Sequence, residues 1–168
     1  MIDGNCYDGR MLENPPTAQL IRPGQGLTLS LLGVTITVKA SAGSTKGVLT
    51  LTEYSAPPRF AGAQPHFHKV MTETFYILEG TLTFTLDGRK VEASAGAYVI
   101  VPPMAIHGFS NPTDAPVKFL VTFNPGGMED YFAELVELAR SEGKWPLSDM
   151  GKVVALARRY DTYPPEER

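Results

Sequence analysis

The stretch HFHKVMTETFYILEG, residues 66–80, places two histidines one residue apart and a glutamate five residues after the second. On a strand, residues i and i+2 point to the same side about 6.6 Å apart, so His66 and His68 can converge on one ion. Glu73 opens the next apolar run, where its carboxylate can complete a mixed nitrogen and oxygen site. Taken singly, a histidine pair of this kind is often a surface feature and Glu73 an ordinary solvated residue.

The third and last histidine of the chain is His107, which opens a short segment after the Pro102-Pro103 break. Alone, it would more often be a hydrogen-bonded core residue. Together, all the histidines lie at spacings compatible with one site. Three neutral imidazoles and a carboxylate suit one divalent transition metal of borderline character, such as Fe, Mn, Co, Ni, Cu or Zn.

The segment around these residues, 27–124, alternates apolar and polar residues with period 2, which predicts half-buried strands. Asp87-Gly88 is a strong hairpin signal between two of them. Many short strands at regular spacing favour a sandwich or barrel. The positions that alternation turns inward, which a plain core would explain equally well, are Phe75, Ile77, Leu82, Phe84, Phe109, Phe119 and Phe123.

The two flanks of this segment differ from it in pattern. Residues 1–26 are rich in Gly and Pro and predict an irregular arm, whereas 125–168 predict two helices and a tail. The first helix has an apolar face around Tyr131 and Leu135 and ends at Gly143. The second is expected to begin after an N-cap at Ser148, and residues from Asp161 onward are expected to fray.

Length and charge exclude several classes of protein. The 168 residues indicate one domain, and the net charge of -3 leaves no basic stripe for nucleic acid. No apolar run is long enough to span a membrane, and the first ten residues show no signal-peptide pattern, so we expect a cytoplasmic protein. The single cysteine, Cys6, excludes an internal disulfide and a cysteine-based zinc site.

These residues resemble the two sequence motifs of the cupins. Two departures fall in turns: Phe60 stands where the first motif has a glycine, with Gly62 two residues later, and Met104 replaces a glycine of the second motif. Since methionine disfavours positive φ, the turn before His107 is expected to differ in shape. The matching positions are His66, His68, Glu73 and Gly80 in the first motif, and Gly96, Pro102, His107 and Asn111 in the second.

The resemblance implies an all-β fold, a double-stranded β-helix or jelly-roll barrel over 27–124 followed by two C-terminal α-helices. It implies a metal inside one mouth of the barrel, and a homodimer. About two coordination positions would stay open for water, substrate or O₂. Phe75, Met104 and Phe109 are expected to line the substrate pocket because they are near the ligands in sequence. The implied ligands are His66, His68, Glu73 and His107.

Within the cupins, the chain is similar to small bacterial quercetinase-like proteins. This predicts a metal-dependent oxygenase for a small aromatic or enolisable substrate, with Glu73 as both ligand and general base. One alternative is a non-oxidative lyase, isomerase or cyclase that uses the same site. Another is a ligand-binding or storage protein without turnover, although the complete ligand set favours catalysis. Fold alone does not choose among these.

Overall fold

The structure is a computed structural model that describes residues 17–143 and 145–168. The part of the predicted arm over 1–16, with Cys6, lies outside the described residues. Residues 17–26 form neither helix nor strand, and every described strand lies between Leu27 and Asn124. No helix in the described ranges is long and apolar enough to cross a membrane.

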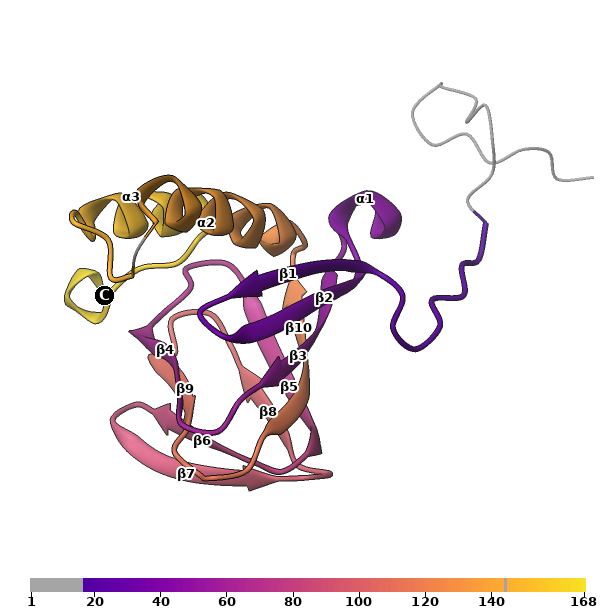
Figure 1. Cartoon of the computed structure of the whole chain (residues 1–168), viewed down its shortest axis with the longest axis horizontal. Helices are drawn as coiled ribbons and strands as arrows, with labels where there is room; N and C mark the ends of the chain where they lie inside the picture. Colours follow the sequence, from indigo (N-terminus) through magenta and orange to yellow (C-terminus); the bar gives the residue numbers. More distant parts are fainter. Residues whose placement is uncertain (1–16, 144) are drawn as a thin grey trace, which may run out of the picture.

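The described strands form two antiparallel sheets that enclose one core (Figure 1). This confirms the all-β jelly-roll barrel. In spatial order, the six-stranded sheet consists of β1 (Leu27–Leu31), β2 (Val34–Ala40), β3 (Thr50–Ala56), β10 (Val117–Asn124), β5 (Thr72–Glu79) and β8 (Tyr98–Val101). The four-stranded sheet consists of β4 (Phe60–His66), β9 (His107–Asn111), β6 (Thr81–Leu86) and β7 (Arg89–Ser94).

Aromatic rings fill the space between the sheets. All seven positions that alternation turned inward are buried, which confirms the period-2 interpretation. The ring of Phe75 on β5 lies 4.9 Å from that of Phe84 on β6 and 5.4 Å from that of Phe109 on β9, measured between centroids. These contacts join the two sheets, since β5 belongs to one and β6 and β9 to the other.

The predicted hairpin joins β6 and β7. Asp87 and Gly88 have φ values of 44° and 81°, the two positive angles that a type I′ turn requires. Asp tolerates this region better than most residues, and Gly adopts it freely.

Two longer helices follow the barrel, α2 (Met128–Glu142) and α3 (Gly151–Arg159), and a 3₁₀ turn, η1 (Pro165–Glu167), follows α3. A short helix, α1 (Ala42–Thr45), lies between β2 and β3. As predicted, α2 ends at Gly143, which is left-handed. The expected N-cap of α3 is wrong: Met150 occupies that position. The N–H and hydroxyl of Ser148 instead donate to the Glu142 carboxylate, at 2.8 and 2.7 Å, and no side chain caps α3.

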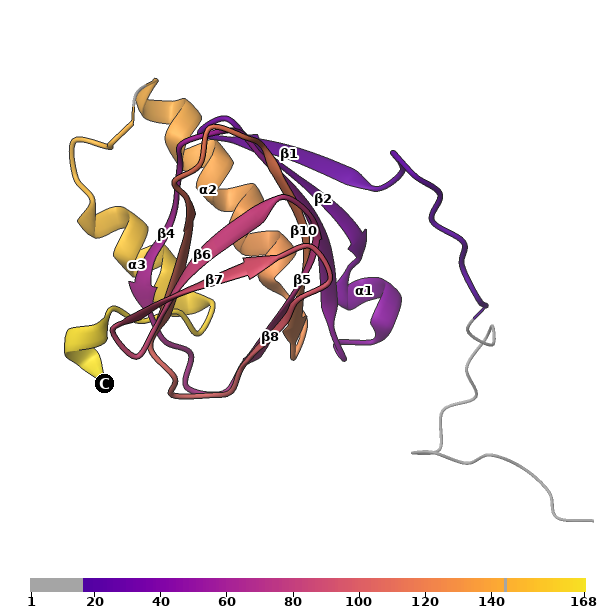
Figure 2. The same ribbon diagram turned by 90° about the horizontal axis from the view of Figure 1, so that it is seen from below.

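The C-terminal tail is ordered, which corrects the expectation that it frays. Tyr163 pairs with Phe67 through two backbone hydrogen bonds of 2.9 Å, and their rings stack at 5.6 Å. Alternation and helical periodicity carry no signal for such an isolated bridge. The tail and α3 therefore lie against the barrel beside α2 (Figures 1 and 2).

Gly62 allows β4 and β9 to approach each other. Its φ is +71°, and a Cβ at this position would overlap the carbonyl oxygen of Phe109. Gly62→Ala should therefore lower the free energy of unfolding by about 1–3 kcal/mol more than Gly88→Ala. The control has a similar positive φ with open space around it. Denaturant titration of both variants checks this, and equal losses would show that the close approach does not matter.

Candidate metal centre

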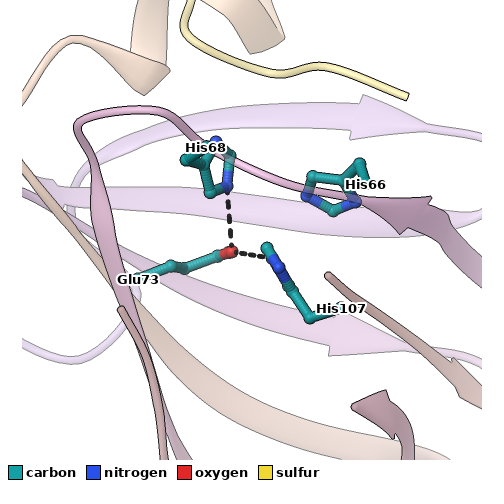
Figure 3. A group of neighbouring side chains, drawn as sticks. All are labelled: His66, His68, Glu73 and His107. Atoms are coloured by element: carbon teal, nitrogen blue, oxygen red, sulfur yellow. Dashed lines mark hydrogen bonds and ion pairs between the residues drawn. The ribbon is translucent and has the colours of Figure 1, made fainter. Parts of the chain in front are cut away.

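Four side chains converge from both sheets at one end of the barrel (Figure 3). His66 ends β4 and His107 begins β9, and the two are direct partners in the strand register. Glu73 lies near the start of β5, in the opposite sheet, and His68 lies in the connection between β4 and β5. One ligand atom from each lies within 4.8 Å of those of the others. The structure thus brings together all four residues that the sequence singled out.

This cluster is largely shielded from water. Glu73 is 3% exposed, His68 is 2% exposed and His107 is fully buried. Burying a carboxylate costs several kcal/mol unless charge and hydrogen bonds compensate it. The side chains of the cluster must therefore satisfy one another or hold a cation.

Each imidazole is oriented by a backbone carbonyl. Because a carbonyl oxygen can only accept, each Nδ1 carries the proton and donates it, which leaves the lone pair on Nε2. Metal-binding histidines are typically held in this way. The three pairs are His66 with the Gln64 oxygen at 2.8 Å, His68 with that of Asp161 at 2.8 Å, and His107 with that of Ala105 at 3.1 Å.

This arrangement calls for a cation at the centre. Glu73 Oε2 lies 2.7 Å from Nε2 of His107 and 3.4 Å from Nε2 of His68. With every Nδ1 already protonated, a neutral imidazole offers only a lone pair at Nε2, so these contacts would place acceptors against each other. Either an added proton or a metal ion resolves the conflict. Three imidazole nitrogens and a carboxylate oxygen fit a divalent transition metal.

The pKa shifts in the cluster reflect the opposing effects of burial and of neighbouring charged groups. Burial lowers the pKa of His66 to about 4, and His107 adds to that effect, so His66 is neutral near pH 7. Burial acts to raise the pKa of Glu73, but hydrogen bonds to His107 and His68 bring it down to about 2. Burial acts to lower the pKa of His68, yet the Glu73 carboxylate raises it above the usual value. An ionised carboxylate thus faces the imidazoles, and a metal ion that binds Nε2 would displace any proton held there to the solvent.

A cavity of about 420 Å³ opens onto the centre. Its barrel wall includes Val34, Ile36, Tyr54, Phe60, Phe109 and Phe123. Its other wall comes from α2, α3 and the tail, and includes Tyr131, Phe132, Leu135, Val153, Thr162 and Tyr163. Glu73 is the only acidic residue in the lining, and no Lys or Arg lines it within the described ranges.

The helical wall is the part of the site that sequence reasoning missed. The apolar faces of α2 and α3 show that they must pack on something, but periodicity does not say on what.

Of the three expected pocket residues, only Phe109 lines the cavity. Phe75 is fully buried in the core, with its ring against that of Phe109, and Met104 is 40% exposed away from the cavity. Closeness to a ligand in sequence was a poor guide, since alternate strand positions reach different depths of the barrel.

Met104 contributes backbone geometry instead. Its φ is +69°, in the left-handed region that glycine adopts freely. The expectation that methionine changes the shape of this turn is therefore wrong as far as φ is concerned. Its N–H donates to the His68 carbonyl at 2.7 Å, which helps to hold that conformation.

Comparison with known proteins agrees with this architecture. The family model "Cupin domain" matches residues 53–123. Quercetin 2,3-dioxygenase from Bacillus subtilis (strain 168) is 33% identical over 70 residues, which cover 42% of this chain and 20% of that protein. The chain therefore spans only a fifth of this curated relative's length.

Two solved structures share the fold. KdgF from Halomonas sp. has a TM-score of 0.59 and 18% identity, covering 68% of this chain and 99% of that one. The polyketide cyclase RemF from Streptomyces resistomycificus has a TM-score of 0.57 and 22% identity, covering 64% and 80%. At such identities the likeness shows the fold alone.

Removing one imidazole should abolish tight metal binding. His66→Ala and His107→Ala should each weaken Co²⁺ binding by at least roughly 100-fold, since losing even an outer partner of a ligand costs about 10–100-fold. Titration of the metal-free protein with Co²⁺ measures this, with circular dichroism to show that the variants fold. Met104→Ala, at an exposed side chain next to the site, is the control. Unchanged affinity in either histidine variant would contradict the four-residue site.

Proposed function

We propose that this chain, whose residues 53–123 match the cupin domain model, is a metal-dependent oxygenase for a small aromatic or enolisable molecule. One observation carries the proposal. The cluster of three histidines and Glu73 opens onto a cavity whose other walls are mostly apolar and aromatic.

The lining of the cavity limits the class of substrate. Recognition of phosphate or of a carboxylate group normally uses Arg or Lys. Neither residue type is found among the described residues that line this cavity. Aromatic rings such as Phe60 and Phe132 instead suit the flat faces of an apolar molecule. Sugar phosphates and small dicarboxylates are therefore poor candidates.

Tyr54 supplies a polar contact in this apolar space. It is 5% exposed and lines the cavity. Burial, together with Glu73 and Tyr131, raises the pKa of Tyr54 well above its usual value. The hydroxyl therefore stays protonated and can donate to an oxygen of the substrate.

The residues of the chain divide the catalytic work. A bound divalent metal would supply Lewis-acid polarisation of a substrate oxygen and keep the substrate where O₂ can reach it. The carboxylate of Glu73 accepts the proton of the substrate hydroxyl, which raises the electron density of the ring. The apolar walls exclude water, and this strengthens the electrostatic interactions inside the cavity.

Two other functions use the same features. A lyase, isomerase or cyclase would need the metal centre and Glu73 as base but no O₂, and one structural neighbour is named as a polyketide cyclase. A binding protein would need the cavity alone. Dependence on O₂ and on Glu73 separates the three.

Glu73→Gln keeps the shape of the side chain but removes its basicity, so turnover of a flavonol or related enolic aromatic compound should fall by roughly 10²–10⁴-fold. Glu53→Gln is the control, because Glu53 pairs with Lys118 in a partly exposed contact. The assay is a substrate panel run with and without O₂. Turnover that persists undiminished without O₂ would contradict the oxygenase, and saturable binding with no turnover in any metal form would indicate a binding protein.

Tyr54→Phe should raise KM about 3–10-fold, the effect of losing one hydrogen bond of roughly 1 kcal/mol. The ring of Phe can keep the stacking of Tyr54 on Phe119, at 4.9 Å between centroids. Tyr98→Phe, at a side chain 57% exposed, is the control. Steady-state kinetics measure the effect, and an unchanged KM would exclude Tyr54 from substrate binding.

A further inference from the structure

The tail that follows α3 runs directly past the connection between β4 and β5, which carries His68 (Figure 3). Asp161 is a residue of the tail that makes several hydrogen bonds with this connection. It contacts the connection with both its side chain and its main chain.

The carboxylate of Asp161 binds three successive backbone N–H groups. Oδ1 accepts from Lys69 at 2.9 Å, while Oδ2 accepts from Val70 at 2.9 Å and from Met71 at 2.8 Å. Consecutive N–H groups that converge on one anion form a nest, which fixes the backbone conformation of the loop. The loop so fixed leads straight into β5 and Glu73.

The main-chain oxygen of Asp161 accepts the hydrogen bond from Nδ1 of His68 at 2.8 Å. The other two histidines donate the corresponding bond to a residue only two positions away, whereas the acceptor for His68 lies 93 positions further along the chain. Asp161 has φ +55°, a conformation that Asp tolerates better than most residues.

The contacts on either side of Asp161 keep it in place. Tyr163 pairs with Phe67 through the two backbone bonds already described, and the Lys69 ammonium lies 3.9 Å from the centroid of the Tyr163 ring. Thr162 and Tyr163 also line the cavity. The same short segment therefore touches the metal-binding loop on one side and the substrate space on the other.

We propose that Asp161 is a positioning residue of the metal centre. Its main-chain oxygen sets the tautomer and direction of His68, and its carboxylate holds the loop that separates His68 from Glu73. The affinity of the protein for a divalent metal therefore depends on the C-terminal tail. This inference rests on the metal site of the proposed function.

Asp161→Asn tests the proposal with the smallest change of shape. An amide nitrogen replaces one carboxylate oxygen, so at least one N–H of the nest faces a donor in place of an acceptor. Affinity for Co²⁺ should fall about 10–100-fold, the usual effect of losing an outer partner of a metal ligand. The matched control is Asp149→Asn, because the Asp149 carboxylate accepts the Gly151 N–H at 2.9 Å, in a contact that involves none of the four ligands. Titration is followed by the visible absorption of Co²⁺ well below the melting temperature of each variant.

The outcomes separate a positioning role from a purely structural one. A variant that melts earlier but binds Co²⁺ with unchanged affinity would overturn the proposal. If the unaltered protein bound no Co²⁺, the metal site itself would fail and the proposed function with it. Normal binding by both the unaltered protein and the variant would overturn only the role of Asp161.

A measurement on the unaltered protein covers the case in which the variant does not fold. Coupling between the tail and the metal is reciprocal, so Co²⁺ should slow amide hydrogen exchange at residues 69–71 and at Tyr163. Amides of β7 serve as the internal reference. Equal exchange at 69–71 with and without Co²⁺ would show that the loop and the metal are not coupled.

Discussion

Three hydrogen bonds, each from Nδ1 of a histidine to a backbone carbonyl, determine what this site can bind. They leave every Nε2 with a lone pair, and those of His107 and His68 face the carboxylate of Glu73 at 2.7 and 3.4 Å, contacts that need either an added proton or a metal ion. The pairing of the strands brings two of these histidines together. The register of β4 with β9 brings His66 opposite His107, and Gly62 allows the two strands to approach.

The apolar cavity beside the metal centre strengthens the electrostatic interactions of the centre. The cavity beside it is walled by aromatic and aliphatic side chains, so the carboxylate and the imidazoles act in a medium of low polarity where their interactions are strong. The helices α2 and α3 are therefore part of the site, since without them the apolar mouth of the barrel would open to water. The tail adds a second role, because it holds His68 through Asp161.

Sequence reasoning predicted half-buried strands from alternation, and it predicted the jelly-roll barrel and the ligand set from the resemblance to the cupin motifs. Alternation reports which strand residues are buried, and the spacing of His66, His68, Glu73 and His107 reports which can meet. It failed where the deciding contact is distant in sequence. The capture of Ser148 by Glu142, the pairing of Tyr163 with Phe67 and the loop nest at Asp161 arise from tertiary packing that no periodicity encodes.

Two of the expected pocket residues were wrong, and two expectations about the whole protein stay predictions. Closeness to a ligand along the chain predicts a pocket position for Phe75 and Met104, but Phe75 is buried in the core and Met104 is exposed outside the cavity. The homodimer and the cytoplasmic location stay predictions, since neither follows from the packing of a single chain.

Anomalous X-ray diffraction from crystals of the metal-loaded protein tests the central claim most directly. Data on either side of the absorption edge of the metal locate the ion without reference to the protein atoms. The account predicts one strong anomalous peak within bonding distance of Nε2 of His66, His68 and His107 and of a carboxylate oxygen of Glu73. A peak at another position, or a metal that leaves one of these histidines unbound, would contradict it.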